Sequence, residues 1–161
     1  MEPTGPALAE QLGALTTGLH GWLAGLDPAR VYAAPAEGEW SVMELFAHMT
    51  EFLGYWSDAA AAIAAAPGVS FGRTVDDGDR TGFVEAHRED PVDVMLAAFS
   101  AAAGHARAQL ASIPEAGWSA VGVHVRQGEM TLRDMVSGHL IRHLAGHWEQ
   151  AKASYAAVAG V

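Results

Sequence analysis

The composition of the 161-residue chain excludes several kinds of function before any motif is considered. Nineteen acidic and nine basic side chains give a formal net charge of −10, which repels phosphate backbones, so we expect no nucleic-acid partner. Because the chain has no cysteine, disulfides, thiolate metal ligands and a thiol nucleophile are excluded, and its length predicts a single domain over residues 1–161.

Apolar residues at helical spacing predict the first two helices. The first covers residues 6–26 and ends before an Asp-Pro pair. The second begins at Ser41, whose hydroxyl can cap the helix while Glu44 completes a capping box. It runs to about Ala66, where a Pro-Gly pair stops it.

A long polar connection, residues 67–90, follows the second helix. A connection of this length crosses the bundle, covers a site or contains a short helix, and residues 81–87 could form one or two helical turns. The acidic residues within 76–79 superficially resemble a calcium loop. They lack its alternating ligands and terminal glutamate, so we interpret them as a solvated turn.

Two further helices complete the pattern, at residues 91–113 and from Thr131 to about Tyr155. Between them, residues 121–125 form a β-like run. A single strand has no partner, so we expect an extended loop over the end of the bundle rather than a sheet. Four amphipathic helices with long connections predict an all-α four-helix bundle with at least one crossover connection.

The fourth predicted helix carries His139, His143 and His147, one every four residues. On an α-helix these three side chains lie within an arc of about 80°. The same face carries Leu140 and Leu144, so we expect the histidines on the buried side. A buried imidazole without a partner costs about 1–3 kcal/mol, and a metal ion would satisfy two of the rings at once.

His48 lies among the apolar positions of the second helix and is the natural third ligand. The spacing alone does not choose between the pairs His139/His143 and His143/His147. Three histidine ligands would leave coordination positions open for water or substrate. The alternative, equally weighted on spacing alone, is a set of hydrogen-bonded core and groove histidines without a metal. The isolated histidines are interpreted as structural: His20, His87 and His105.

Two segments resemble signatures of the DinB/YfiT-like superfamily of metal-binding four-helix bundles. Residues 40–49, WSVMELFAHM, match the pattern W-S-x-x-E-x-x-x-H-[LM] that opens its second helix. Residues 139–150, HLIRHLAGHWEQ, are similar to its last helix, in which H-x-x-x-H is followed three residues later by glutamine. That glutamine sets the register, so the resemblance implies His48, His143 and His147 as the metal ligands.

The resemblance implies a DinB-like fold, one divalent ion (Zn, Ni or Fe) and, frequently, a homodimer. Characterised relatives include thiol-dependent transferases and isomerases that use mycothiol, bacillithiol or glutathione, and many members have no known activity. We therefore expect a metal-dependent enzyme of the S-transferase or isomerase type, acting on a small molecule. Its thiol would be a low-molecular-weight cofactor, since the chain has no cysteine. The alternative is a non-catalytic metal- or ligand-binding stress-response protein.

Four side chains near the expected ligands could orient them, although each could equally be an ordinary exposed helix residue: Glu44, Glu51, His139 and Gln150.

Assembly and location are also predicted. Trp22, Trp56 and Phe99, together with alanine-rich helix faces, offer more apolar surface than a small bundle buries, so we expect a homodimer formed through helices. The N-terminus lacks the features of a signal peptide. The most apolar run, residues 59–66, is far shorter than the ~20 residues of a membrane span. We therefore expect a cytoplasmic protein without membrane contact.

Overall fold

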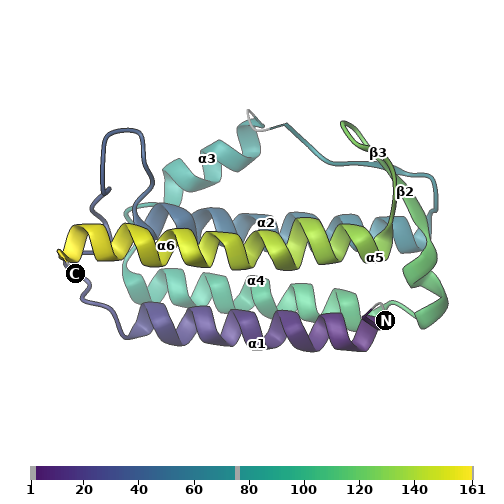
Figure 1. The fold of residues 1–161 in the computed structure, drawn as a ribbon, viewed down its shortest axis with the longest axis horizontal. Helices are drawn as coiled ribbons and strands as arrows, with labels where there is room; N and C mark the ends of the chain where they lie inside the picture. Colours follow the sequence, from purple (N-terminus) through teal and green to yellow (C-terminus); the bar gives the residue numbers. More distant parts are fainter. Residues whose placement is uncertain (1–2, 75–76, 161) are drawn as a thin grey trace.

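Four long helical segments form a bundle in the computed structural model, which describes residues 3–74 and 77–160 (Figure 1). This confirms the predicted all-α four-helix bundle. The fourth segment is one continuous helical path made of three parts. In chain order the bundle elements are α1 (Gly5–Ala24), α2 (Val42–Ala65), α4 (Val92–Ser112), and then α5 (Leu132–Met135), η2 (Val136–Arg142) and α6 (His143–Ala159).

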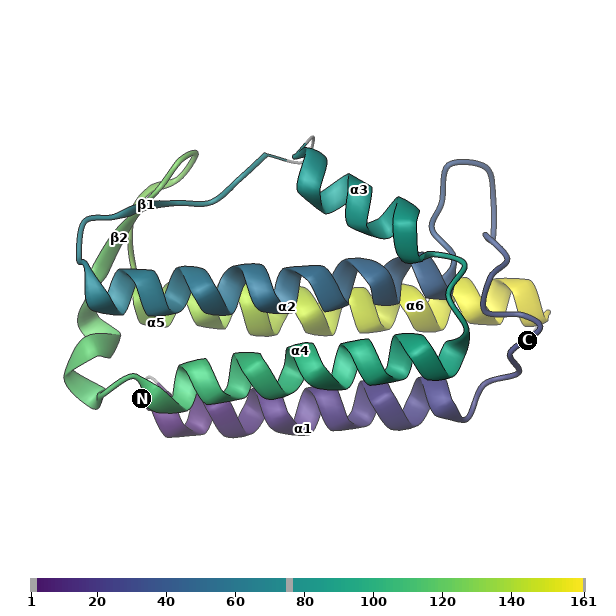
Figure 2. The same cartoon turned by 180° about the vertical axis from the view of Figure 1, so that it is seen from behind.

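The bundle contains a crossover connection. Helix α4 packs against both α1 and α2, and the fourth segment contacts α1 and α2 on the other side. Figures 1 and 2 show α2 and α4 running in the same direction, opposite to α1 and α6. The chain between α2 and α4 must therefore return along the whole bundle. It does so through β1 (Ser70–Phe71) and α3 (Gly78–His87), and α3 lies against α2. The predicted crossover is confirmed, and the predicted short helix is longer than two turns.

The starts of the two histidine-bearing segments are fixed by the predicted caps. The Glu44 amide donates to the Ser41 hydroxyl at 3.2 Å, and the Ser41 amide donates to the Glu44 carboxylate at 2.8 Å. At the fourth segment, the Asp134 amide donates to the Thr131 hydroxyl at 3.1 Å. Each cap satisfies amides that would otherwise lack a partner, which sets the register of every histidine that follows.

The core is one cluster of aliphatic and aromatic side chains from all four segments. Full burial of each large side chain contributes about 1.5–3 kcal/mol, so this cluster supplies most of the stability of the fold. Phe99 is fully buried and Trp56 is 9% exposed, because both pack inside the chain's own core. These two residues therefore supply no free apolar surface for a homodimer, contrary to our expectation.

The expectation that residues 121–125 form an unpaired loop is wrong. They contain β2 (Val121–His124), which pairs antiparallel with β3 (Gly128–Thr131) and parallel with β1. The hairpin closes at Gly128, whose φ of 79° is a conformation that glycine adopts readily. The third strand of the sheet, β1, comes from the crossover connection. With two residues it is too short to show a periodic pattern in the sequence. The small sheet covers one end of the bundle (Figure 2).

Within the acidic cluster, residues 77–79 start a helix. Asp77 is the N-cap of α3, and its carboxylate accepts from the amides of Asp79 and Arg80. Asp76 lies outside the described residues. Within the part of the chain that the structure describes, no helix is both long and apolar enough to cross a membrane.

Candidate metal centre

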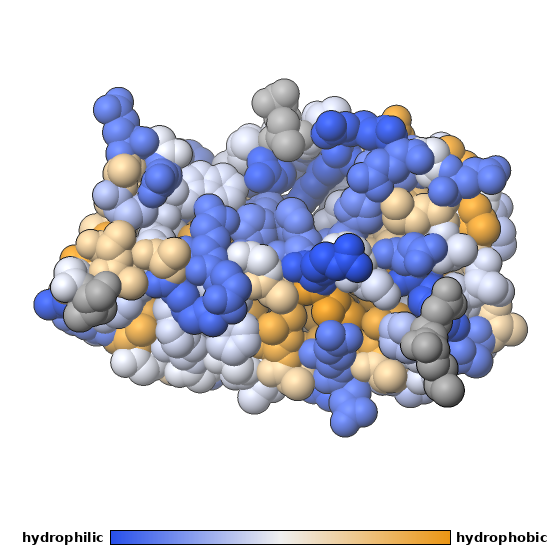
Figure 3. All heavy atoms as spheres, in the orientation of Figure 1, coloured by the Kyte–Doolittle hydropathy of each residue, from blue (hydrophilic) through white to orange (hydrophobic). Residues whose placement is uncertain are grey.

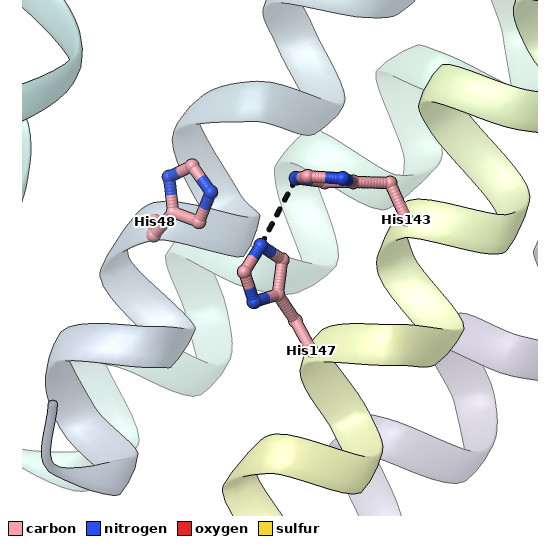
Figure 4. A group of neighbouring side chains, drawn as sticks. All are labelled: His48, His143 and His147. Carbon is pink, nitrogen blue, oxygen red and sulfur yellow. Dashed lines mark hydrogen bonds between the residues drawn. The ribbon is translucent and has the colours of Figure 1, made fainter. Parts of the chain in front are cut away.

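Three histidines from two helices meet in the space between α2 and α6 (Figure 4). We refer to His48, His143 and His147 as the histidine triad. One ring nitrogen of each lies within 4.8 Å of the corresponding nitrogens of the other two. Figure 4 shows the two rings of α6, one turn apart, pointing toward His48 of α2. The structure thus brings together the three residues that the family resemblance implies.

His48 is the buried member of the triad, with 2% of its surface exposed. Neither of its ring nitrogens has a hydrogen-bond partner among the described residues. Its ring lies between the aromatic rings of Trp40 and Phe52, whose centroids are 5.2 and 5.3 Å away. A buried polar group left in this state costs about 1–3 kcal/mol. A bound cation would satisfy one of the two nitrogens.

The orientation of His147 is set by Gln150. The Nδ1 atom of His147 lies 2.9 Å from the Gln150 amide oxygen. An amide oxygen only accepts, so Nδ1 carries the proton and Nε2 has a free lone pair. That Nε2 lies 3.0 Å from Nε2 of His143 (Figure 4). Ligand atoms around a tetrahedral zinc ion are about 3.4 Å apart, so the donor set fits a divalent ion.

Burial keeps the triad in the neutral state that binds metal. It lowers the pKa of His48 to about 2, and the charges of His147 and Arg80 act in the same direction. Burial of the ring also lowers the pKa of His143 to about 4, although the residue as a whole is exposed. For His147, burial lowers the pKa, while the hydrogen bond that its Nδ1 donates to Gln150 opposes the shift. At neutral pH no proton competes with a cation for the triad.

A small cavity of about 120 Å³ lies beside the triad. Two members of the triad form part of its wall, and the remaining wall comes from α2, from the crossover connection and α3, and from η2. The lining residues are His48, Phe52, Trp56, Arg73, Thr74, Arg80, His139 and His143.

Comparison with known proteins places the fold in a family. A family model described as the DinB superfamily matches residues 11–151. The chain belongs to the DinB superfamily. This DinB-superfamily chain has no match among curated proteins.

Solved structures share the fold of this DinB-superfamily chain at low sequence identity. YfiT from Bacillus subtilis, described as a probable metal-dependent hydrolase with an unusual four-helix bundle topology, gives a TM-score of 0.74 at 12% identity, with 97% of this chain and 84% of YfiT covered. Mycothiol-dependent maleylpyruvate isomerase gives 0.68 at 14% identity, and a mutant of it gives 0.72 at 12%. Both matches cover 93% of this chain but only 60% of the isomerase.

His139 does not join the triad. Its ring stacks between those of Trp56 and His124, with centroids 4.9 and 5.0 Å away, and its Nε2 lies 3.1 Å from the Gln127 amide oxygen. We call Trp56, His124 and His139 the ring stack. The expected 80° arc assumed an α-helix throughout, but η2 is π-helical and changes the rotation per residue. Nor are the α6 histidines buried as expected, because His143 is exposed and His147 half-buried.

His124 is a site-adjacent residue that the sequence analysis missed. It is 5% exposed, and its Nδ1 accepts from the amides of Arg126 and Gln127 at 3.1 and 3.2 Å. The available signal was its place at the end of a β-like run, directly before a turn. Burial lowers the pKa of both His124 and His139.

The remaining candidates have roles away from the triad. The Glu44 carboxylate belongs to the capping box, and the Glu51 carboxylate forms a bidentate ion pair with Arg73. His87 and His105 contact Asp90 and Asp58, each at 2.8 Å, in line with the structural interpretation. Of the four side chains proposed to orient ligands, Gln150 contacts the triad, through Nδ1 of His147.

Proposed function

We propose that this DinB-superfamily chain is a metal-dependent enzyme in which the histidine triad holds one divalent ion, Zn, Ni or Fe. The observation that supports the ligand set most strongly is the buried His48, whose two ring nitrogens lack partners while the donor atoms of His143 and His147 lie within 4.8 Å. Three protein ligands leave coordination positions toward the cavity, which is the arrangement of catalytic rather than structural sites.

We propose further that the reaction depends on a low-molecular-weight thiol and is an S-transfer or an isomerisation of a small molecule. A bound divalent ion would lower the pKa of a thiol or water that binds to it. The thiol must come from outside, because the chain has no cysteine. The structural likeness to a mycothiol-dependent isomerase supports a thiol, and the likeness to YfiT supports water as the alternative nucleophile.

The chain's own residues would prepare the site in three ways. Gln150 holds the His147 ring with its unprotonated nitrogen toward the triad. Phe52, which lies 5.2 Å from the ring of His143, excludes water from one side. The neutral imidazoles add no negative charge, so the full charge of the ion would act on the bound nucleophile.

An activity screen tests this proposal. Protein loaded separately with Zn²⁺, Ni²⁺ and Fe²⁺ is assayed with mycothiol, bacillithiol and glutathione against electrophilic and isomerisable substrates. Turnover with one thiol, lost in His147→Ala, is the expected result. Turnover without thiol would favour a hydrolase. Stoichiometric metal binding without any turnover would favour the non-catalytic stress-response alternative.

We also propose that the chain forms a homodimer through its helices. An apolar patch lies between α1 and the fourth segment in Figure 3, where a groove is lined in part by the half-buried Leu15 and Ala145. Sedimentation at micromolar concentration should give the mass of a dimer, and Leu15→Glu should reduce it to that of a monomer. A monomeric wild-type mass would contradict the proposal.

A further inference from the structure

Two arginines line the cavity beside the histidine triad. Arg73 and Arg80 share its wall with His48 and His143, and no aspartate or glutamate is among the described lining residues. The chain as a whole has a formal charge of −10 and only nine lysines and arginines. The cavity therefore has two guanidinium groups in its wall although the molecule as a whole is acidic.

Arg73 is held rigidly. Both of its terminal nitrogens contact the carboxylate of Glu51, and Asp77 lies 3.8 Å away. Its guanidinium carbon is 4.0 Å from the centre of the Tyr55 ring, and only 10% of its side chain is exposed. The charge of Arg73 is thus largely compensated by Glu51. Its role at the cavity is to form a fixed polar wall.

Arg80 lies beside the triad. It lines the same cavity as His48 and His143. It is also 5.4 Å from the centre of the Trp40 ring, which itself packs on His48. Arg80 also has contacts of its own.

The position of Arg80 matters because neutral histidines bring no negative charge to a divalent ion. A guanidinium near the ion repels it unless an anion lies between the two. A ligand with a negative group is attracted to both cations, and arginine binds carboxylates with paired hydrogen bonds. The cavity of about 120 Å³ has the volume of about four water molecules, which admits a small organic anion.

We propose that the cavity takes a small ligand that carries a carboxylate, bound by Arg80 beside the Arg73–Glu51 pair while another atom of the ligand reaches the triad. This inference rests on the proposed function, since it names the class of small molecule that the metal site would act on or use. Arg80 is then a residue that determines specificity.

Two thiols that differ only in charge test the inference. Protein loaded with Co²⁺ is titrated with 3-mercaptopropionate and with 3-mercaptopropionamide, and the sulfur-to-cobalt absorption band reports binding. We expect wild-type protein to bind the carboxylate about tenfold more tightly than the amide. Arg80→Gln should remove this preference and still bind the amide. Arg107→Gln, in the groove between α1 and α4, is the matched control and should keep the preference.

A second measurement does not depend on the metal. Propionate added to metal-free protein should shift the indole N–H signals of Trp40 and Trp56 in ¹H–¹⁵N spectra, and propionamide should not. The shifts should vanish in Arg80→Gln. Equal affinities for the two thiols, or unchanged propionate shifts in Arg80→Gln, would overturn the inference while leaving metal binding intact. Failure to bind cobalt would instead overturn the proposed function.

Discussion

The histidine triad and the ring stack lie beside the same cavity and share the fourth segment, yet their buried histidines, His48 and His124, differ in hydrogen bonding. In the ring stack, Nδ1 of His124 accepts two amide hydrogen bonds and Nε2 of His139 contacts an amide oxygen. In the triad, both nitrogens of His48 lack partners among the described residues. A buried histidine can thus serve packing or be available to bind a ligand, and the hydrogen bonding of its ring nitrogens distinguishes the two cases.

The largest effect that we expect is on metal binding, which should depend on the histidine triad and not on the ring stack. His143→Ala or His147→Ala should abolish stoichiometric binding of a divalent ion, because each removes one of three ligands. His139→Ala should retain the ion, since its ring belongs to the ring stack. Metal content after dialysis, measured by mass spectrometry, checks both results. Loss of the ion from the His139 variant together with its retention by the His147 variant would reverse our assignment.

The buried ring of His48 should make the metal-free protein sensitive to acid. As pH falls below 6.5, the unfolded chain binds a proton at residue 48 while the folded chain, with a pKa of about 2, does not. The free energy of unfolding should therefore fall by about 1.4 kcal/mol per pH unit from this group.

Urea unfolding of wild type and His48→Leu at pH 6.5 and 4.5, with chelator present, measures this contribution. The wild type should lose about 2 kcal/mol more than the variant over this interval. Equal losses would show that the pKa of His48 is not depressed in the folded state.

Removal of the side chain that orients His147 should weaken metal binding without abolishing it. Gln150→Leu removes the acceptor for His147 Nδ1, so the ring is free to rotate and change tautomer. Loss of such a partner typically reduces metal affinity by about 10–100-fold. Calorimetric titration with Zn²⁺ checks the prediction. Glu149→Gln, which affects only an exposed contact with Lys152, is the control and should bind normally.

The smallest effect concerns the support of the ring stack. At Gly72 a Cβ atom would lie 2.6 Å from the His124 ring, and φ is +96°. Gly72→Ala should lower the free energy of unfolding by about 1–3 kcal/mol and leave metal binding unchanged. Gly128→Ala is the matched control, because its φ of +79° carries the same backbone cost in open space. If the free energy of unfolding falls no more in Gly72→Ala than in the control, the His124 ring moves aside without loss of stability.

The sequence was sufficient for the parts of the site that depend on local rules. The Ser41 and Thr131 caps and the period of the leucines fix where the histidine-bearing helices start, and hence which rings can meet. The family motifs point to the same three residues. The crossover followed from the length of the polar connection between the second and third helices, since a short loop would have sufficed for antiparallel neighbours.

The parts that sequence reasoning missed depend on contacts between distant segments. Phe71 belongs to a two-residue strand whose partner, at His124, lies more than fifty residues further along the chain. Nothing local marks such a pairing. Nothing local singles out Arg73 and Arg80 either, because only the return path of the crossover places them beside the triad.

The π-helical segment gives the fourth helix a change of phase between its two halves. Such a segment is equivalent to one extra residue inserted into an α-helix. Deletion of one residue from η2 would turn α5 by about 100° relative to α6 and carry His139 away from Trp56 and His124, while His143 and His147 kept their mutual geometry. Insertions and deletions at this point could therefore remodel one wall of the cavity independently of the other. Relatives with the same metal-binding helix could acquire different substrate pockets in this way.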